Sequence, residues 1–90
     1  MSETKKFNVY FFHTDEETCE WWLTLEARGV IAETQREALE KTYNTDDKFF
    51  DARDYRVYAS GKRVKLRGSL SGKELNQAWE KAGDSVSVEK

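Results

Sequence analysis

Alternating apolar and polar positions dominate the first third of the chain and predict a β-hairpin. Residues Phe7 to Phe12 are mostly aromatic or β-branched, and from Cys19 to Ala27 every second residue is apolar. A period of two places these side chains on one face of a strand. Arg28-Gly29 interrupts the pattern, and we expect a β-bulge there before the strand continues through Val30 to Ala32. The alternative is a turn into another short strand.

Two capping boxes predict where two helices begin. In Thr34-Gln35-Arg36-Glu37, the hydroxyl and the carboxylate can each accept a hydrogen bond from an unpaired amide at the helix start. Ser71-Gly72-Lys73-Glu74 repeats this pattern. Apolar residues recur at helical spacing from Leu75, and Gly83 is placed to end the second helix.

A second hairpin is predicted between the helices, with strands at Tyr55 to Ser60 and Arg63 to Leu70. Gly61-Lys62 joins them, with glycine where a tight turn needs a positive φ. The resulting order is β-β-α-β-β-α. It indicates an α+β fold, in which an antiparallel β-sheet carries two short helices packed on one face.

Length and composition support one small domain. The chain has 90 residues, of which 38% are hydrophobic and 36% charged, so one core can form under a densely charged surface. We expect a single domain over residues 6–83, a flexible N-terminus at 1–5, and a flexible tail or short edge strand at 84–90. Cys19 is the single cysteine, which suits a reducing compartment, and no apolar run is long enough for a signal sequence or a bilayer span. We therefore expect a cytoplasmic location.

Few residues could carry chemistry. The sequence contains no phosphate-binding glycine loop, metal-ligand spacing or nucleophile elbow, and it implies no cofactor. His13 and Cys19 could form a nucleophilic pair across the first hairpin, but a strand-end imidazole and a half-buried thiol are the simpler interpretation. Acidic pairs such as Asp46-Asp47 lack the spacing of a calcium loop. We therefore expect no enzymatic activity.

Charge is divided unevenly along the chain. Residues 1–47 carry five Lys/Arg against eleven Asp/Glu, a net charge of −6, whereas residues 48–90 carry ten against six, a net charge of +4. Cations alternate with apolar residues in the predicted second hairpin, so we expect an exposed basic face there. Its members are Arg56, Tyr58, Arg63, Lys65 and Arg67. This face could bind an acidic protein or nucleic-acid phosphates, or it could only keep an outer strand soluble.

Aromatic residues exceed what one core face needs. Trp21 and Trp22 are adjacent on a strand and therefore point to opposite faces. If helices cover only one face, Trp22, Tyr10 and Phe12 form an exposed aromatic patch, which makes Trp22 a further candidate for partner binding. The preferred alternatives are that the loop carrying Phe49-Phe50 folds over these residues, or that Trp22 lies beneath lysine stems.

One resemblance rests on the junction between the first hairpin and the first helix. The run from Ala32 to Glu40, preceded by a hairpin beginning at Lys5-Lys6-Phe7 and followed by a strand containing Arg56, resembles the small phage-encoded inhibitors of bacterial RNA polymerase. In that family a strand–strand–helix–strand domain binds the polymerase through arginines on the strand after the helix. Arg56 matches one of these positions, and Tyr58 occupies the other. The similarity covers about residues 5–60 and implies a phage or mobile-element origin.

These features together predict a non-enzymatic protein-binding module. Its form would be a phage or mobile-element inhibitor, monomeric or homodimeric, that binds and blocks a host protein or protein complex through the basic strand face. The alternative is a small nucleic-acid-binding domain that uses the same face, and its affinity would fall steeply with salt. Neither hypothesis involves a membrane.

Overall fold

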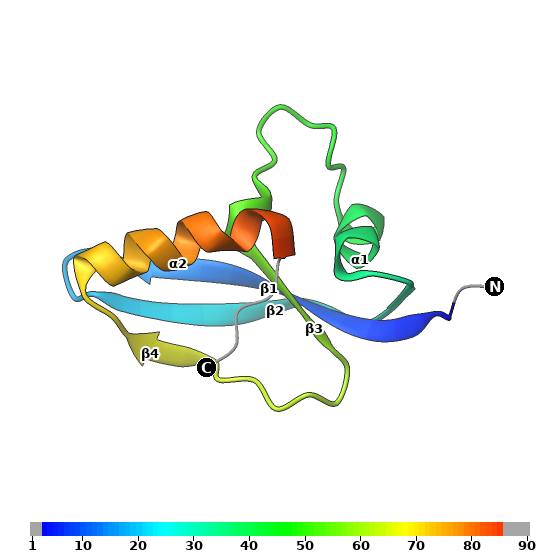
Figure 1. The fold of residues 1–90 in the computed structure, drawn as a ribbon, viewed down its shortest axis with the longest axis horizontal. Coiled ribbons are helices and arrows are strands. Elements are labelled where there is room, and N and C mark those ends of the chain that lie inside the picture. The colour runs from blue at the N-terminus through cyan, green and yellow to red at the C-terminus, as the bar shows by residue number, and fades with distance from the viewer. Residues whose placement is uncertain (1–2, 86–90) are drawn as a thin grey trace.

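The structure is a computed structural model that describes the backbone of residues 3–85 and the side chains of residues 3–80. A four-stranded antiparallel sheet and two α-helices confirm the predicted α+β class and element order (Figure 1). The elements are β1 (Lys5–Asp15), β2 (Glu20–Ala32), α1 (Gln35–Thr42), the short 3₁₀ helix η1 (Ala52–Asp54), β3 (Tyr55–Ala59), β4 (Arg67–Ser69) and α2 (Gly72–Ser85). No helix in the described part of the chain has the length and apolar content to cross a bilayer.

The long β1–β2 hairpin carries two irregularities in its register. The first lies between Phe7 and Val9 and confirms the predicted bulge. Gly29 adopts a φ of +68° there, and its N–H donates to the Asn8 side chain at 3.0 Å. Since this φ strains any residue with a Cβ, glycine is the residue that suits the position.

The second irregularity was not predicted, and it changes which side chains face the same way. Val9 lies opposite Ala27 and Tyr10 lies opposite Leu25, so β2 holds one extra residue, Glu26, at this point. Neighbours on β1 point to opposite faces, and therefore Ala27 and Leu25 do so too. The alternation of β2 is therefore shifted by one residue at Glu26, so that Leu25 faces one side of the sheet and Ala27 the other.

Both capping boxes are confirmed. At the start of α1, the Thr34 hydroxyl accepts from the Glu37 N–H at 3.0 Å, and the Glu37 carboxylate accepts from the Glu33 N–H at 2.6 Å. At the start of α2, Ser71 and Glu74 exchange hydrogen bonds between side chain and backbone at 3.0 and 3.3 Å.

The predicted end of α2 at Gly83 is wrong, because the helix continues to Ser85. A glycine within a helix costs only about 1 kcal/mol, so it need not end one. The predicted tail or edge strand at 84–90 overlaps the end of α2 in its first two residues. The remaining residues, 86–90, lie outside the described part of the chain.

The two helices pack over different ends of the hairpin (Figure 1) and cover two separate hydrophobic clusters. The buried members of the α1 cluster are Phe7, Val9, Ala32, Ala38, Leu39 and Val57. Those of the α2 cluster are Phe12, Trp21, Leu23, Tyr58 and Leu75.

These clusters lie on opposite faces of the sheet. Val57 and Tyr58 are neighbours on β3, so their side chains point to opposite faces, yet each is buried in a different cluster. The prediction that both helices pack on one face is therefore wrong. Strands β1 and β3 carry apolar residues on both faces, and burying both sets requires a layer on each side.

The predicted second hairpin is also wrong. The turn itself forms, with Gly61 at a φ of +90° and the Lys62 N–H donating to the Ala59 carbonyl at 3.0 Å. The strand order is β3-β1-β2-β4, so β3 and β4 lie on opposite edges and do not pair (Figure 1). The intervening chain instead crosses toward β2, where the Leu66 carbonyl accepts from the Leu23 N–H at 2.7 Å. Each short strand thereby pairs with the backbone N–H and C=O groups along one edge of the long hairpin.

Candidate functional site

The structure divides the predicted binding residues between the two faces of the sheet. Arg56 and Tyr58 are only 1% and 5% exposed, so the prediction that they belong to an exposed basic face is wrong. Both point into the α2 side because α2 covers the face of β3 that the sequence pattern assigned to solvent. The remaining members are exposed, namely Trp22, Arg63, Lys65 and Arg67.

Trp22 and Arg67 are brought together on the other face. In the sheet His13 lies opposite Trp22, and Trp22 lies opposite Arg67. Directly opposed residues in antiparallel strands share a face, so these three form a row across β1, β2 and β4. We call the surface formed by Phe11, His13, Trp22, Thr24 and Arg67 the Trp22 face.

Ring stacking holds the Trp22 face in one arrangement. The His13 and Trp22 rings are parallel to within 8°, with their centroids 5.2 Å apart. The Nε2 atom of His13 lies 2.9 Å from the Thr24 hydroxyl, and the centroids of the Phe11 and His13 rings are 4.8 Å apart. Trp22 remains 36% exposed, so it is a large apolar side chain that is both accessible and held in place.

Further aromatic contacts connect Phe11 of the Trp22 face to Tyr55 on β3, and Tyr55 to the loop after α1. The Tyr55 ring lies 5.3 Å from Phe11 and stacks on Phe50 at 5.4 Å. The Tyr43 hydroxyl donates to the Glu26 carboxylate at 2.8 Å. Partial burial, reinforced by that carboxylate, raises the pKa of Tyr43 well above its usual range, so the phenol stays neutral.

The predicted aromatic patch of Trp22, Tyr10 and Phe12 is wrong in its membership. Phe12 is buried in the α2 cluster, and Tyr10, two residues away on β1, packs against the same cluster. Phe50, on the loop that was expected to fold over these residues, stacks on Tyr55 instead of Trp22. The register of the hairpin decides this grouping, because it places Trp22 beside His13 instead of beside Phe12. The sequence offered one signal, since the length of the connecting turn sets that register.

The candidate nucleophilic pair does not form. His13 belongs to the Trp22 face, whereas Cys19 packs against the α2 cluster on the opposite side of the sheet. The Cys19 thiol donates to the Glu16 carbonyl at 3.8 Å, within the turn of the hairpin. Among the side chains that the structure describes, those of residues 3–80, His, Cys, Asp and Glu form no group of three that could hold a metal ion.

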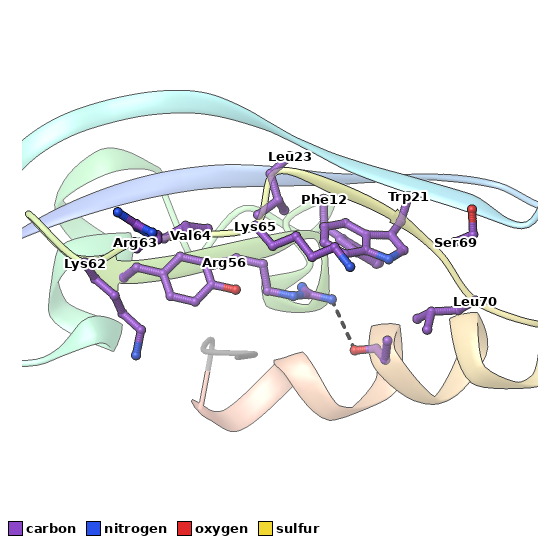
Figure 2. Close-up of a pocket in the computed structure, with 12 residues that line it drawn as sticks. Phe12, Trp21, Leu23, Arg56, Lys62, Arg63, Val64, Lys65, Ser69 and Leu70 are labelled. Atoms are coloured by element: carbon purple, nitrogen blue, oxygen red, sulfur yellow. Dashed lines mark hydrogen bonds between the residues drawn. The ribbon is translucent and has the colours of Figure 1, made fainter. Parts of the chain in front are cut away.

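A cavity of about 190 Å³ lies on the α2 side, between the sheet, α2 and the segment that leads to β4 (Figure 2). Arg56 reaches across it from β3 and donates to the Ala78 carbonyl of α2 at 3.1 Å. The same guanidinium donates to the carbonyls of Arg53 and Tyr55, and it lies 3.9 Å from the centre of the Phe12 ring. Burial lowers the pKa of Arg56 to about 10, so the group is still a cation at neutral pH.

The chain matches no protein-family model, no curated protein and no solved structure.

Proposed function

We propose that this protein is a non-enzymatic binding module that recognises a protein partner through the Trp22 face. The observation that supports this most directly is an exposed tryptophan, stacked in place by His13 and directly opposite an exposed arginine. Tryptophan and arginine are the residue types most enriched at the energetic centres of protein interfaces. A side chain that is already ordered before binding loses little entropy when the partner arrives.

A protein partner is favoured over a nucleic acid by the burial of Tyr58. The nucleic-acid hypothesis needed this ring for base stacking beside the cations, but it is buried under α2. Trp22 is the one exposed ring of the Trp22 face, since Phe11 and His13 are partly buried, whereas sheet-face RNA binders usually present two or three stacking rings. The chain also has a net charge of −2, which opposes attraction to phosphates at long range.

The resemblance to phage-encoded inhibitors of bacterial RNA polymerase supports a bacterial host complex as the partner and inhibition as the consequence of binding. Arg56, the residue that carries the resemblance on β3, is buried in this structure. Contact would therefore come from Trp22 and Arg67. Both were candidate binding residues, although the sequence pattern assigned them to different surfaces.

Affinity capture from a bacterial lysate tests this proposal, with and without nuclease treatment. The bait proteins are the wild type, Trp22→Ala and Arg67→Glu. Phe49→Ala is the matched control, because Phe49 is a large apolar side chain, 82% exposed on the loop after α1, that is not one of the residues of the Trp22 face. Truncating a central interface tryptophan is expected to weaken binding by about 2 kcal/mol or more, a loss of roughly 30-fold.

We expect one stoichiometric protein to be retained by the wild type and Phe49→Ala, with and without nuclease, and to be lost with Trp22→Ala and Arg67→Glu. Recovery that disappears on nuclease treatment would replace the proposal with nucleic-acid binding. Equal capture by Trp22→Ala and the wild type would move the interface to another surface and overturn the proposal.

A further inference from the structure

The cavity on the α2 side combines apolar walls with positive charge. Its walls come from side chains such as Phe12, Trp21, Leu23 and Leu70. Among the described residues, four that line the cavity are cationic and none is acidic; the cations are Arg56, Lys62, Arg63 and Lys65. The cavity lies on the opposite side of the sheet from the Trp22 face, so a ligand bound in it would be independent of the proposed function.

Arg56 is the unusual member of this lining. It is almost fully buried, yet none of the ion pairs among the described residues includes it. Its partners are three backbone carbonyls, which use three of the five N–H groups of a guanidinium. Carbonyl oxygens satisfy hydrogen bonds but supply no negative charge. The Asp54 carboxylate favours the cation without forming an ion pair with it, and burial outweighs this effect. An anion in direct contact with the guanidinium would offset the cost of that burial.

We propose that this cavity binds a small organic anion with an apolar body, of which a ring-bearing monocarboxylate is the simplest kind. A carboxylate accepts paired hydrogen bonds from a guanidinium and neutralises its charge. The apolar body occupies the space between Phe12, Trp21 and Leu23. The volume suits such a ligand, since an apolar cavity of about 150 Å³ takes up benzene.

The rim of the cavity adds a second element of selectivity. Arg63 and Lys65 are exposed at its lining, on the segment that crosses from β3 to β4 (Figure 2). Positive side chains around an opening attract anions and disfavour cations of the same size. The buried guanidinium therefore fixes the carboxylate, and the rim selects the sign of charge that enters.

Three probes separate the two parts of the proposed ligand. Benzoate carries both the ring and the charge, benzyl alcohol carries the ring alone, and acetate carries the charge alone. Binding is followed by the indole N–H signals in two-dimensional NMR spectra. Trp21 lines the cavity, whereas Trp22 lies on the other face and serves as an internal control.

We expect benzoate to shift the Trp21 signal saturably, with Trp22 unaffected, and to bind at least about tenfold more tightly than either other probe, as the loss of a charged hydrogen bond predicts. Benzyl alcohol binding as tightly as benzoate would overturn the proposal, because the charge would not be recognised. The absence of any saturable Trp21 shift with benzoate would overturn it as well.

Two sets of variants locate the anion. Arg56→Met retains the apolar stem and is expected to abolish the preference for benzoate over benzyl alcohol. The double substitution Arg63→Gln and Lys65→Gln changes only exposed side chains, so it tests the site even where Arg56→Met does not fold. It is expected to weaken benzoate binding roughly two- to fivefold at low salt, whereas the matched control Lys73→Gln, outside the cavity, leaves it unchanged. If Lys73→Gln weakens benzoate binding as much as the double substitution does, or if the double substitution has no effect, the proposed binding site is wrong.

Discussion

The two faces of the sheet are built differently, although the same strands supply both. Among the described residues, the α1 side buries no charged side chain, and Val9, Leu39 and Val57 are completely buried there. The α2 side holds a cavity and the buried cation Arg56. The α1 side therefore contributes mainly to stability, whereas the α2 side has room for a ligand.

The largest effect is expected from truncating matched leucines in the two clusters. Leu39→Ala should cost about 4 kcal/mol in the free energy of unfolding, because the α1 cluster is closely packed and the space left behind stays empty. Leu75→Ala should cost only about 2 kcal/mol, since the α2 side already contains a cavity and its helix can settle into the added space. Urea unfolding of both variants measures the difference. Equal costs would contradict the proposed difference in packing between the two sides.

Arg56→Met tests whether the buried cation contributes to stability. The substitution leaves the Arg53, Tyr55 and Ala78 carbonyls without this donor. We expect that loss to outweigh the relief of removing a buried charge, with a net cost of about 2 kcal/mol in unfolding free energy. Arg63→Met, an exposed arginine on the rim of the cavity, is the matched control and should change stability by less than about 0.5 kcal/mol. If Arg56→Met is as stable as the wild type, the fold does not depend on this charge.

A comparable effect is expected where β4 joins the sheet. A Cβ at Gly68 would lie 2.9 Å from the Trp21 ring, so Gly68→Ala forces either the indole or β4 to move. We expect a cost of about 2 kcal/mol and a changed Trp21 indole signal. Gly72→Ala is the control, because a Cβ there meets nothing within 4 Å and alanine favours the helix. An unchanged stability of Gly68→Ala would show that β4 is held loosely.

Local patterns predicted local structure correctly. The bulge at Gly29 and both capping boxes depend on neighbouring residues, and each is confirmed. The predicted strand alternation holds from Trp21 to Leu25 and fails at Ala27, beyond the extra residue Glu26. The turn at Gly61 also forms. These features follow from hydrogen bonds and dihedral angles within a few residues, which a single sequence displays.

Long-range choices could not be obtained in the same way. The pattern of Arg56 and Tyr58 shows which residues share a strand face, but not whether a helix covers that face. Nor does it show that the strands flanking Gly61 separate to opposite edges of the sheet. The extra residue at Glu26 changes the phase of β2 and leaves no mark in the apolar pattern. The candidate site was therefore predicted by residue type, through Trp22 and Arg67, but not by arrangement.

The smallest effect concerns the contact that ties α2 to η1. The Trp79 indole donates to Asp54 at 3.0 Å, and the Arg53 guanidinium lies 3.8 Å from the centre of the Trp79 ring. Asp51 holds that guanidinium through hydrogen bonds of 3.1 and 2.9 Å. These hydrogen bonds to Arg53 lower the pKa of Asp51. On the α2 side, attachment of the helix thus depends partly on charge.

Because the pKa of Asp51 is lower in the folded protein than in the unfolded chain, the unfolded chain binds more protons at acidic pH. The contribution of the Asp51 charge to stability is therefore fully present above the usual aspartate pKa of about 3.9. It is lost as the pH falls through the pKa of Asp51 in the folded protein. Asp51→Asn keeps an acceptor for the η1 cap but removes the charge. We expect a lower urea midpoint than the wild type at pH 7 and a difference that disappears in acid. Glu40→Gln, in the exposed Arg36–Glu40 pair on α1, is the control and should show no such dependence. If the urea midpoint of Asp51→Asn stays below that of the wild type at low pH, the packing of α2 on η1 does not depend on the Asp51 charge. The α1 and α2 sides would then both be stabilised by apolar packing and neutral hydrogen bonds.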